Sequence, residues 1–321
     1  MTMMYRHFHE GEARLQLESG VDTAAFDQLV EQPFRPALSE SEARFVDARN
    51  FSVAASVDHR GRPWASPLIG RPGELFSVQA PTSVRAAPRA IEGDPLFRNI
   101  TDTGELGVLY FDPARRRRMK SLGRAEVAHD GSILYRMDRS FGLCSKYIFK
   151  RSLELEGAAG SEPSDIPPHE ERSHLDAEDR TQLQDSDTVF LASHHAEHGT
   201  DPTHRGGPPG FVTVLDETSI SLPDYLGNGM FQTLGNLLID SRIGLLCIDY
   251  RSGRTIQITG VGTIARAPAG DAYATRILSI SIDEVRVIWT PGRWADIEPF
   301  ELRPGLINPA TPYLDTEVRP A

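Results

Sequence analysis

The sequence predicts a mainly β fold with a few helices, of the α+β class, built as two tandem barrels from one duplicated unit. Three observations predict it. The chain repeats itself without gaps at an offset of 137 residues, each copy contains short strands joined by turn-type residues, and each copy carries one helix within that run. Because about six strands with one helix are typical of a small closed barrel, we expect one barrel in each copy.

The repeat is carried by residues that shape the backbone, which a duplicated fold needs in the same places. The matching pairs are Ala55 and Ala192, Ser56 and Ser193, Gly70 and Gly207, Pro72 and Pro209, Gly73 and Gly210, Asn99 and Asn236, Gly107 and Gly244, Asp112 and Asp249, Arg117 and Arg254, and Gly123 and Gly260. One fold therefore occurs twice, and the differences between the copies indicate function.

The first unit is expected over residues 38–150, after an N-terminal helical arm over residues 1–37. The arm holds one helix, at about residues 10–19, with Pro33 and Pro36 ending the arm. Ser39 and Glu42 have the spacing of a capping box, which predicts a short helix there. Strands are then expected at residues 51–57, 64–69, 107–111 and 123–127, with a turn joining the first two.

The second unit is expected over residues 183–267, after an acidic linker over residues 151–182 that contains a short helix. Residues 268–321 are expected to form a C-terminal extension. The predicted strands of this unit are 188–193, 210–215, 219–222, 243–250 and 255–264, and the predicted helix is 230–238. The last strand alternates polar with β-branched residues, which is typical of a half-buried strand.

Bulk composition excludes some classes of partner. The 321 residues carry a formal net charge of -11, which argues against nucleic acid or an anionic membrane surface as the main partner. The run from Arg115 to Arg118 is an exception that we interpret as a solvated turn. Two cysteines are too few for a disulfide framework, and the polar start shows no signal peptide or membrane span. We therefore expect a soluble, cytoplasmic protein.

Two glycine-rich stretches distinguish the second copy: HRGGPPGF from His204 and LPDYLGNGMF from Leu222, the latter followed by Leu234-Gly235-Asn236. They resemble the predicted flavin-nucleotide-binding branch of the pyridoxamine 5'-phosphate oxidase-like, FMN-binding split-barrel family. Its pattern is S-x-R-G-G-x-P-G-F followed by P-x-Y-x-G-N-G-M-x-x-S-x-G-N. The resemblance covers most of residues 183–267. It is weaker over residues 38–150, where the segment 140–148 looks like F-G-N-C-P-K-Y-I, and the opening FHEGE also looks like that branch.

The resemblance implies FMN as the cofactor, and the residue types suit it. A flavin phosphate needs cationic side chains and backbone N–H groups that approach it closely. His204 and Arg205 offer the side chains, and the glycines at 206–207 or 227–229 offer the backbone. The expected cofactor-binding residues are Ser193, His204, Arg205, Gly206, Gly207, Tyr225, Asn228, Gly229, Met230, Asn236 and, from the first copy, Lys146.

The chain also departs from that family. The S-R-K-G phosphate clamp of the oxidase is replaced by Gly227-Asn228-Gly229-Met230, which puts pyridoxamine oxidase activity in doubt. In the first copy, Leu68 stands opposite Arg205 and Pro67 opposite His204. We therefore expect the first barrel to have lost its own phosphate site and to form the opposite wall of a flavin site. The sequence leaves open whether the barrels pair within a chain or across a dimer, although a homodimer is expected.

Other site classes are less well supported by the sequence. The four histidines 194, 195, 198 and 204 match no compact zinc pattern, so we interpret them as solvated turn residues and expect no metal. No catalytic triad, phosphate-binding Walker loop or dinucleotide motif is present, and no catalytic residue is identified. The leading hypothesis is an FMN-dependent oxidoreductase acting on NAD(P)H or a small-molecule substrate. The alternatives are a flavin-binding carrier or redox sensor without turnover, and a binder of haem or a deazaflavin.

Overall fold

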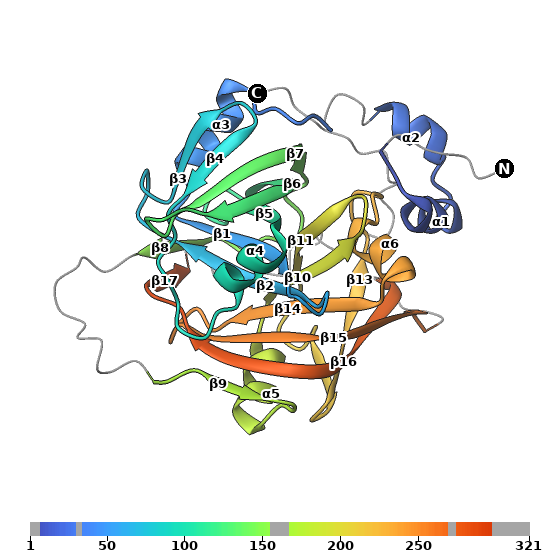
Figure 1. The fold of residues 1–321 in the computed structure, drawn as a ribbon. Coiled ribbons are helices and arrows are strands. Elements are labelled where there is room, and N and C mark those ends of the chain that lie inside the picture. The colour runs from blue at the N-terminus through green and yellow to red at the C-terminus, as the bar shows by residue number, and fades with distance from the viewer. Residues whose placement is uncertain (1–6, 30–33, 155–166, 269–273, 297–321) are drawn as a thin grey trace.

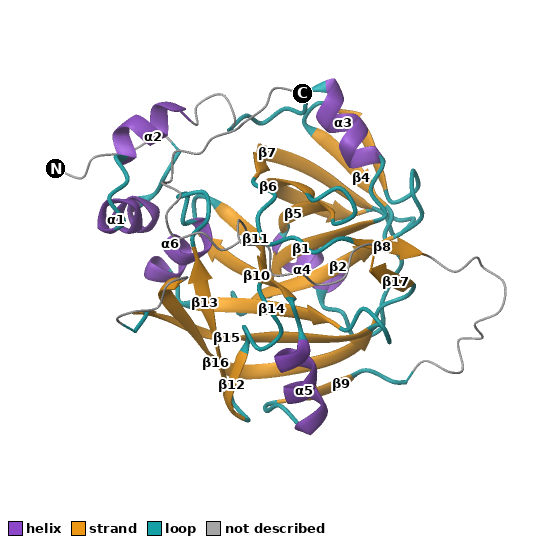
Figure 2. Ribbon diagram, turned by 180° about the vertical axis from the view of Figure 1, so that it is seen from behind, coloured by secondary structure: helices purple, strands orange, loops and turns teal. Residues whose placement is uncertain are grey.

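The computed structural model describes residues 7–29, 34–154, 167–268 and 274–296, and it is mainly β (Figures 1 and 2). Its first large sheet has the strand order β2-β1-β5-β6-β7-β4-β3. These strands are β1 (Phe51–Val57), β2 (Pro63–Ile69), β3 (Phe76–Ala80), β4 (Ser83–Ala86), β5 (Glu105–Asp112), β6 (Arg117–Val127) and β7 (Ile133–Leu143).

The second large sheet repeats this order strand for strand, as β11-β10-β14-β15-β16-β13-β12, and the short strand β9 (Glu170–Arg172) pairs with the C-terminal part of β16. Its other strands are β10 (Thr188–His195), β11 (Gly199–Gly206), β12 (Thr213–Asp216), β13 (Ser219–Tyr225), β14 (Arg242–Ile248), β15 (Arg254–Arg266) and β16 (Ala274–Trp289). Each half also contains one helix at the equivalent place in the chain: α4 (Leu96–Thr103) before β5, and α6 (Gln232–Ile239) before β14.

The sequence repeat has a structural cause at Gly123 and Gly260. Each lies where the ladder to the next strand shifts register, between β6 and β7 in one half and between β15 and β16 in the other. A Cβ atom on Gly123 would collide with the carbonyl oxygen of Arg136, and one on Gly260 with that of Ser281. Both copies therefore need a glycine at this bulge.

The two halves pack against each other within the one chain. A Cβ on Gly107 of β5 would collide with the carbonyl oxygen of Thr200, and one on Gly244 of β14 would lie 2.6 Å from that of Pro63. These two contacts are equivalent under the 137-residue repeat, so the halves meet about an internal twofold axis. A shared apolar core lies between them, formed by Phe51, Val53, Ala55, Ala65, Ile69, Leu109, Phe111, Ile148, Leu153, Phe190, Ala192, Leu246 and Ile248.

The N-terminal arm contains two helices, α1 (Glu10–Glu18) and α2 (Thr23–Leu29), where the sequence analysis expected one. The predicted helix at about residues 10–19 is confirmed as α1, which lies beside α6 of the second half (Figures 1 and 2). The predicted capping box is also confirmed. The hydroxyl of Ser39 accepts from the N–H of Glu42, and the Glu42 carboxylate accepts from the N–H of Ser39, at the start of α3 (Glu40–Asp47).

Several predicted boundaries differ from the structure. The strand expected at 210–215 begins only at Thr213, because Gly210 adopts a positive φ of 88° in the turn before it. The sequence analysis did not predict β16, which extends the second sheet to Trp289. Residues 151–187 hold β8 (Arg151–Glu154), β9 and the helix α5 (Ala177–Asp185), and β8 pairs with β17 (Arg293–Asp296). Pro33 lies outside the described residues.

No helix in the described part of the chain combines the length and the apolar character needed to cross a membrane.

Candidate functional site

A pocket lies between the two halves of the chain, and both halves contribute side chains to it. The first half supplies β6, the end of β7 and the loop that follows. The second half supplies β11, β13 and the segment that leads into α6. The lining residues are Arg118, Lys120, Leu143, Cys144, Tyr147, Thr203, His204, Arg205, Gly206, Phe211, Pro223, Asp224, Tyr225, Gly227, Asn228, Gly229, Met230, Phe231, Gln232, Thr233 and Leu234.

Most of the residues predicted to bind a cofactor come together in this pocket. They arrive from three separate segments of the second half: the end of β11, the end of β13 and the loop before α6. The predicted residues that line the pocket are His204, Arg205, Gly206, Tyr225, Asn228, Gly229 and Met230. The other four, Ser193, Gly207, Asn236 and Lys146, are not among the lining residues.

Ser193 and Asn236 form a hydrogen-bonded pair, and an equivalent pair occurs in the first half. The Nδ2 of Asn236 donates to the Oγ of Ser193 at 2.9 Å, and the Nδ2 of Asn99 donates to the Oγ of Ser56 at 3.0 Å. All four side chains are buried. Because the half without the glycine-rich motif contains the same pair, the pair ties a helix to a strand in both copies. That structural role explains why these residues follow the repeat.

Gly207 and Lys146 lie close to the pocket without lining it. A Cβ on Gly207 would lie 2.6 Å from the ring of Phe211, which does line the pocket. Lys146 contributes its backbone carbonyl, which accepts from Nη2 of Arg118 at 3.5 Å. Gly207 therefore contacts the lining residue Phe211, and Lys146 contacts the lining residue Arg118.

His204 is buried in the pocket wall with one ring nitrogen unpaired. Nη1 of Arg118 lies 2.8 Å from its Nδ1, and because a guanidinium can only donate, Nδ1 accepts and Nε2 carries the proton. That Nε2–H has no hydrogen-bond partner among the described residues. Burial, together with the nearby charges of Arg118 and Arg205, holds the pKa of His204 well below its usual value, so the ring is neutral.

Arg205 is half-buried beside His204 and is only partly paired. Its Nη1 donates to Asp224 at 2.6 Å, while its buried Nε has no partner in the part of the chain that the structure describes. A buried N–H group without an acceptor is costly, by about 1–3 kcal/mol. Two such donors in one wall, at His204 and Arg205, are therefore suited to a ligand that carries hydrogen-bond acceptors.

Sequence reasoning missed the two cationic residues that the first half adds. The run from Arg115 to Arg118 was interpreted as a solvated turn, and this holds for the exposed Arg115 but is wrong for Arg118, which belongs to β6 and lines the pocket. Lys120 lies two residues further along β6, on the same face of the strand. It is fully buried, forms an ion pair with Asp201, and donates to Gln232 at 3.2 Å.

The segment before α6 brings exposed backbone to the pocket. Gly229 and Phe231 have positive φ angles of 75° and 55°, and no side chain caps the start of α6. The first N–H groups of a helix lack partners inside the helix, so this start can accept an anion. The hydroxyl of Tyr147 donates to the carbonyl of Leu226 at 2.8 Å, which fixes the segment to the first half.

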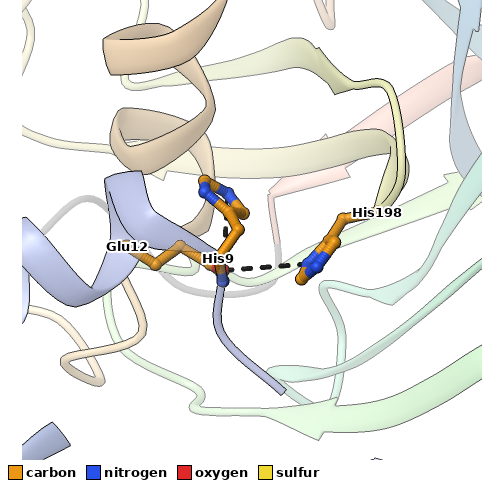
Figure 3. A group of neighbouring side chains, drawn as sticks. All are labelled: His9, Glu12 and His198. Carbon is orange, nitrogen blue, oxygen red and sulfur yellow. Dashed lines mark hydrogen bonds and ion pairs between the residues drawn. The ribbon is translucent and has the colours of Figure 1, made fainter. Parts of the chain in front are cut away.

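A cluster of histidines outside the pocket attaches the N-terminal arm to the second half. Nε2 of His9 lies 3.4 Å from Oε2 of Glu12, and Nδ1 of His198 lies 3.9 Å from the same oxygen. Figure 3 shows these three side chains gathered at the start of α1. The ring of His195 stacks on His9 at 4.2 Å. The expectation of solvated histidines is therefore wrong for His195 and His204, which are buried, and His194 and His198 are half-buried. His195 is buried because His9, at the start of α1, stacks on it, whereas His204 is buried against Phe111 and Phe190.

These ring nitrogens lie within metal-binding distance of one another, but hydrogen bonds already use them. Gly11 donates its N–H to Nδ1 of His9, and the N–H groups of Glu197 and His198 donate to Nδ1 of His195. Nη1 of Arg139 lies 3.1 Å from Nδ1 of His198. Each Nδ1 is therefore an acceptor and each Nε2 carries the proton, whereas a metal ion needs a free lone pair. The arrangement serves to attach the arm.

Parts of the chain are similar to solved structures of pyridoxamine 5'-phosphate oxidase-like, FMN-binding split-barrel proteins, each of which covers about a third of it. One is a protein of the pyridoxinephosphate oxidase family from Clostridium acetobutylicum, with 12% identity over 37% of this chain and 92% of that chain and a TM-score of 0.27. Another is the FAD-binding protein from Mycobacterium smegmatis, with 10% identity over 38% of this chain and 99% of that chain and a TM-score of 0.25.

The chain is also similar to the solved structure of the heme storage protein HutZ from Vibrio cholerae, with 10% identity over 34% of this chain and 89% of that chain and a TM-score of 0.26. No protein-family model matches the sequence, and no curated protein matches it. At these identities the likeness does not indicate which ligand this chain binds.

Proposed function

We propose that the pocket between the halves binds FMN and that the protein is an FMN-dependent oxidoreductase. In this proposal each half is a split barrel. A flavin held there would supply the chemistry for transferring hydride or electrons between NAD(P)H, or a small reduced substrate, and an acceptor. The observation that carries the proposal is one wall of the pocket. There the neutral Nε2–H of His204 and the Nε of Arg205 are buried with no acceptor among the described residues, beside the cationic side chains of Arg118 and Lys120.

This wall suits the phosphate of FMN. A phosphate carries close to two negative charges and several strong acceptor oxygens, so it can accept from both unpaired donors. Charge complementarity comes from the guanidinium groups of Arg118 and Arg205. The S-R-K-G clamp is missing from the segment 227–230, but Arg118 and Lys120 of the first half bring basic groups to the same pocket.

The rest of the lining suits a flat, largely apolar ring. Tyr147 and Tyr225, one from each half, stack with ring centroids 5.5 Å apart, and Phe211 and Met230 add apolar surface. Ligand pockets combine such surface with a few placed polar groups. When bound, the flavin would supply the redox chemistry, and the role of these residues is to hold and orient it. No catalytic acid or base is assigned, since hydride transfer requires stacking geometry more than a proton shuttle.

Haem is less well supported as the ligand at this wall. An axial histidine coordinates iron through a nitrogen lone pair, and Arg118 occupies the lone pair of His204 Nδ1. A deazaflavin shares the ring and phosphate chemistry of FMN, and the absorption spectrum of the bound ligand separates the two.

The test is the visible spectrum of the purified protein, recorded before and after incubation with FMN and desalting. We expect retained flavin bands that bleach at a catalytic rate when NADH or NADPH is added anaerobically. Retained flavin that neither nicotinamide nor a panel of small reductants turns over would support the carrier or sensor alternative. A protein that retains no flavin would overturn the proposal.

A further inference from the structure

We propose that each chain has one open ligand pocket and takes one ligand, because the position related to the pocket by the internal repeat is closed by the chain's own side chains. In a protein with two equivalent halves about a twofold axis, every pocket between the halves has a counterpart on the other side. The stoichiometry rests on the proposed function, since it takes FMN as the ligand. The closure of the counterpart rests only on contacts within the chain.

The counterpart is found by applying the 137-residue repeat to the lining residues. Lys120 of the open pocket corresponds to Gln257, and Thr203 corresponds to Ser66. The segment at Met230–Phe231 corresponds to Gly93–Asp94. The strand pairing gives one further correspondence. Lys120 pairs with Phe141 across β6 and β7, and Gln257 pairs with Arg286 across β15 and β16, so Arg286 corresponds to Phe141.

Hydrogen bonds join these counterpart walls directly. Nε2 of Gln257 lies within hydrogen-bond distance of Oδ2 of Asp94 at 3.0 Å, of Oγ of Ser66 at 3.2 Å and of the carbonyl oxygen of Ala65 at 2.9 Å. Nη1 of Arg286 donates to the carbonyl of Gly93 at 3.1 Å. On the open side, Lys120 also joins its strand to the hairpin and to the start of α6, through Asp201 and Gln232. The bond of Arg286 to the loop is specific to the closed side, because Phe141 occupies the equivalent position on the open side and its side chain cannot donate a hydrogen bond.

The residues behind these bonds also fill space. Trp64 corresponds to Asp201, which is the ion-pair partner of Lys120. The side chain of Trp64 is only 1% exposed. The guanidinium carbons of Arg62 and Arg286 lie 5.6 and 4.9 Å from the centre of its ring. Arg62 and Arg286 both bond to Glu284. The ring of Trp64 and the two arginines that bond to Glu284 therefore occupy the region where the other half has the short side chain of Asp201.

The chemistry of the closed side also differs from that of the open side. His204 and Arg205 correspond to Pro67 and Leu68, so the closed side has no counterpart of these two donors, and its arginines Arg62 and Arg286 already donate to Glu284. An anionic ligand would meet the carboxyl group of Asp94 instead. Closure and loss of the donors occur together on the same side of the molecule.

The first measurement is stoichiometry. The full chain is saturated with FMN and desalted, and the flavin released by denaturation is quantified against the protein concentration. We expect 1.0 flavin per chain, and 2.0 would overturn the proposal. A value of zero would overturn the proposed function, and the second measurement, which uses no flavin, then decides whether one pocket is open.

The second measurement compares two single cysteines at equivalent positions, Thr203→Cys and Ser66→Cys, in a Cys144→Ser background. Cys247 stays as an internal control, because it is fully buried and burial raises the pKa of its thiol to about 12. We expect methyl methanethiosulfonate to modify the cysteine at position 203 at least a hundredfold faster than the one at position 66. Equal rates, with both variants folded by thermal unfolding, would show two open pockets and overturn the proposal.

Discussion

Arg205 enters the pocket with one side of its guanidinium group already held. Its Nη1 donates to Asp224 and its Nε has no acceptor among the described residues, so a ligand oxygen could complete the set. We expect Arg205→Ala to weaken FMN binding on the order of tenfold to a hundredfold, because a hydrogen bond to a charged group contributes about 1.5–3 kcal/mol. Fluorescence titration of FMN measures it. The control is Arg98→Ala on the exposed face of α4. Unchanged affinity in Arg205→Ala would refute the phosphate assignment.

Asn236 gives a second prediction at the scale of one residue. Asn236 donates to Ser193, as its counterpart Asn99 donates to Ser56. In addition, the Oδ1 of Asn236 accepts from Nε2 of His9 at 2.9 Å. We expect Asn99→Ala and Asn236→Ala to lower the free energy of unfolding by about 1–3 kcal/mol, with the larger loss for Asn236 because two buried partners lose their bond. Denaturant unfolding of both variants checks the order. A smaller loss for Asn236→Ala would contradict it.

Single residues also show what the sequence could and could not predict about the site. The glycine-rich stretches predicted seven lining residues, because a motif that shapes one stretch of backbone is local and visible in the chain. Arg118 and Lys120 were missed because they reach the pocket only when the first half packs on the second. The same holds for His195, whose burial depends on an arm nearly two hundred residues earlier in the chain.

Among the elements, α1 is attached by groups whose charged forms burial disfavours. Burial, aided by the charge of Asp201, raises the pKa of Glu12 to about 8, while burial and the neighbouring His195 lower the pKa of His9 to about 4. Burial, with Arg139, lowers the pKa of His198 to about 3. Lys120, Glu10 and Glu197 are further charges that act on this cluster. The docked arm therefore favours a protonated Glu12 and neutral histidines.

The pH dependence follows from these directions. Between pH 4.5 and 8 the folded state binds more protons at Glu12 than the unfolded state, so stability falls as the pH rises through that window. Below about pH 6.5 the unfolded histidines gain protons that the docked ones do not, so stability also falls as the pH decreases toward 4. We expect a maximum near pH 6 and a decline on the order of a few kcal/mol by pH 8.

Thermal unfolding from pH 4 to pH 9 measures this profile, and Glu12→Gln is the matched variant. Gln keeps the size of the side chain and an oxygen that can accept from the N–H of His9. We expect it to remove the decline above pH 6 and to keep the decline below it. The same alkaline decline in Glu12→Gln would show that another group causes it.

Elements differ in how readily their sequence reveals them. The start of the helix that follows Ser39 was predictable because its capping box is local. The strand β16 also carries a local signal, since its residues alternate between buried and exposed along most of its length. The repeat gives no support there, because the hairpin of β15 and β16 is longer than that of β6 and β7, which shifts the offset from 137 to 145. The second unit was bounded at residue 267, the limit of the family resemblance, so the boundary fell before this strand.

For the whole molecule, Gly107 and Gly244 control how closely the halves approach. A Cβ at either position would collide with backbone of the other half, and backbone cannot move aside as a flexible side chain can. We expect Gly107→Ala and Gly244→Ala each to destabilise the fold by roughly 3 kcal/mol or more. Gly142→Ala is the control, because a Cβ added there would meet no other described atom within 4 Å. Equal unfolding midpoints for all three variants would contradict the close packing.

At this scale the sequence predicted the duplication well, because glycines fixed by sterics occur in step in both copies. It could not decide whether the two copies pair within a chain. That depends on the contact of Gly107 with Thr200 and of Gly244 with Pro63, which joins residues distant in sequence.

The packing of both halves in one chain also changes how the pocket depends on concentration. A pocket shared by two separate subunits disappears when the subunits dissociate, whereas here a covalent connection holds the two walls at a high effective concentration. Assembly of the pocket is then a first-order process that dilution does not reverse. Each wall is also encoded separately, so a substitution at Arg118 changes one side of one pocket and leaves Thr255, its counterpart, as it was.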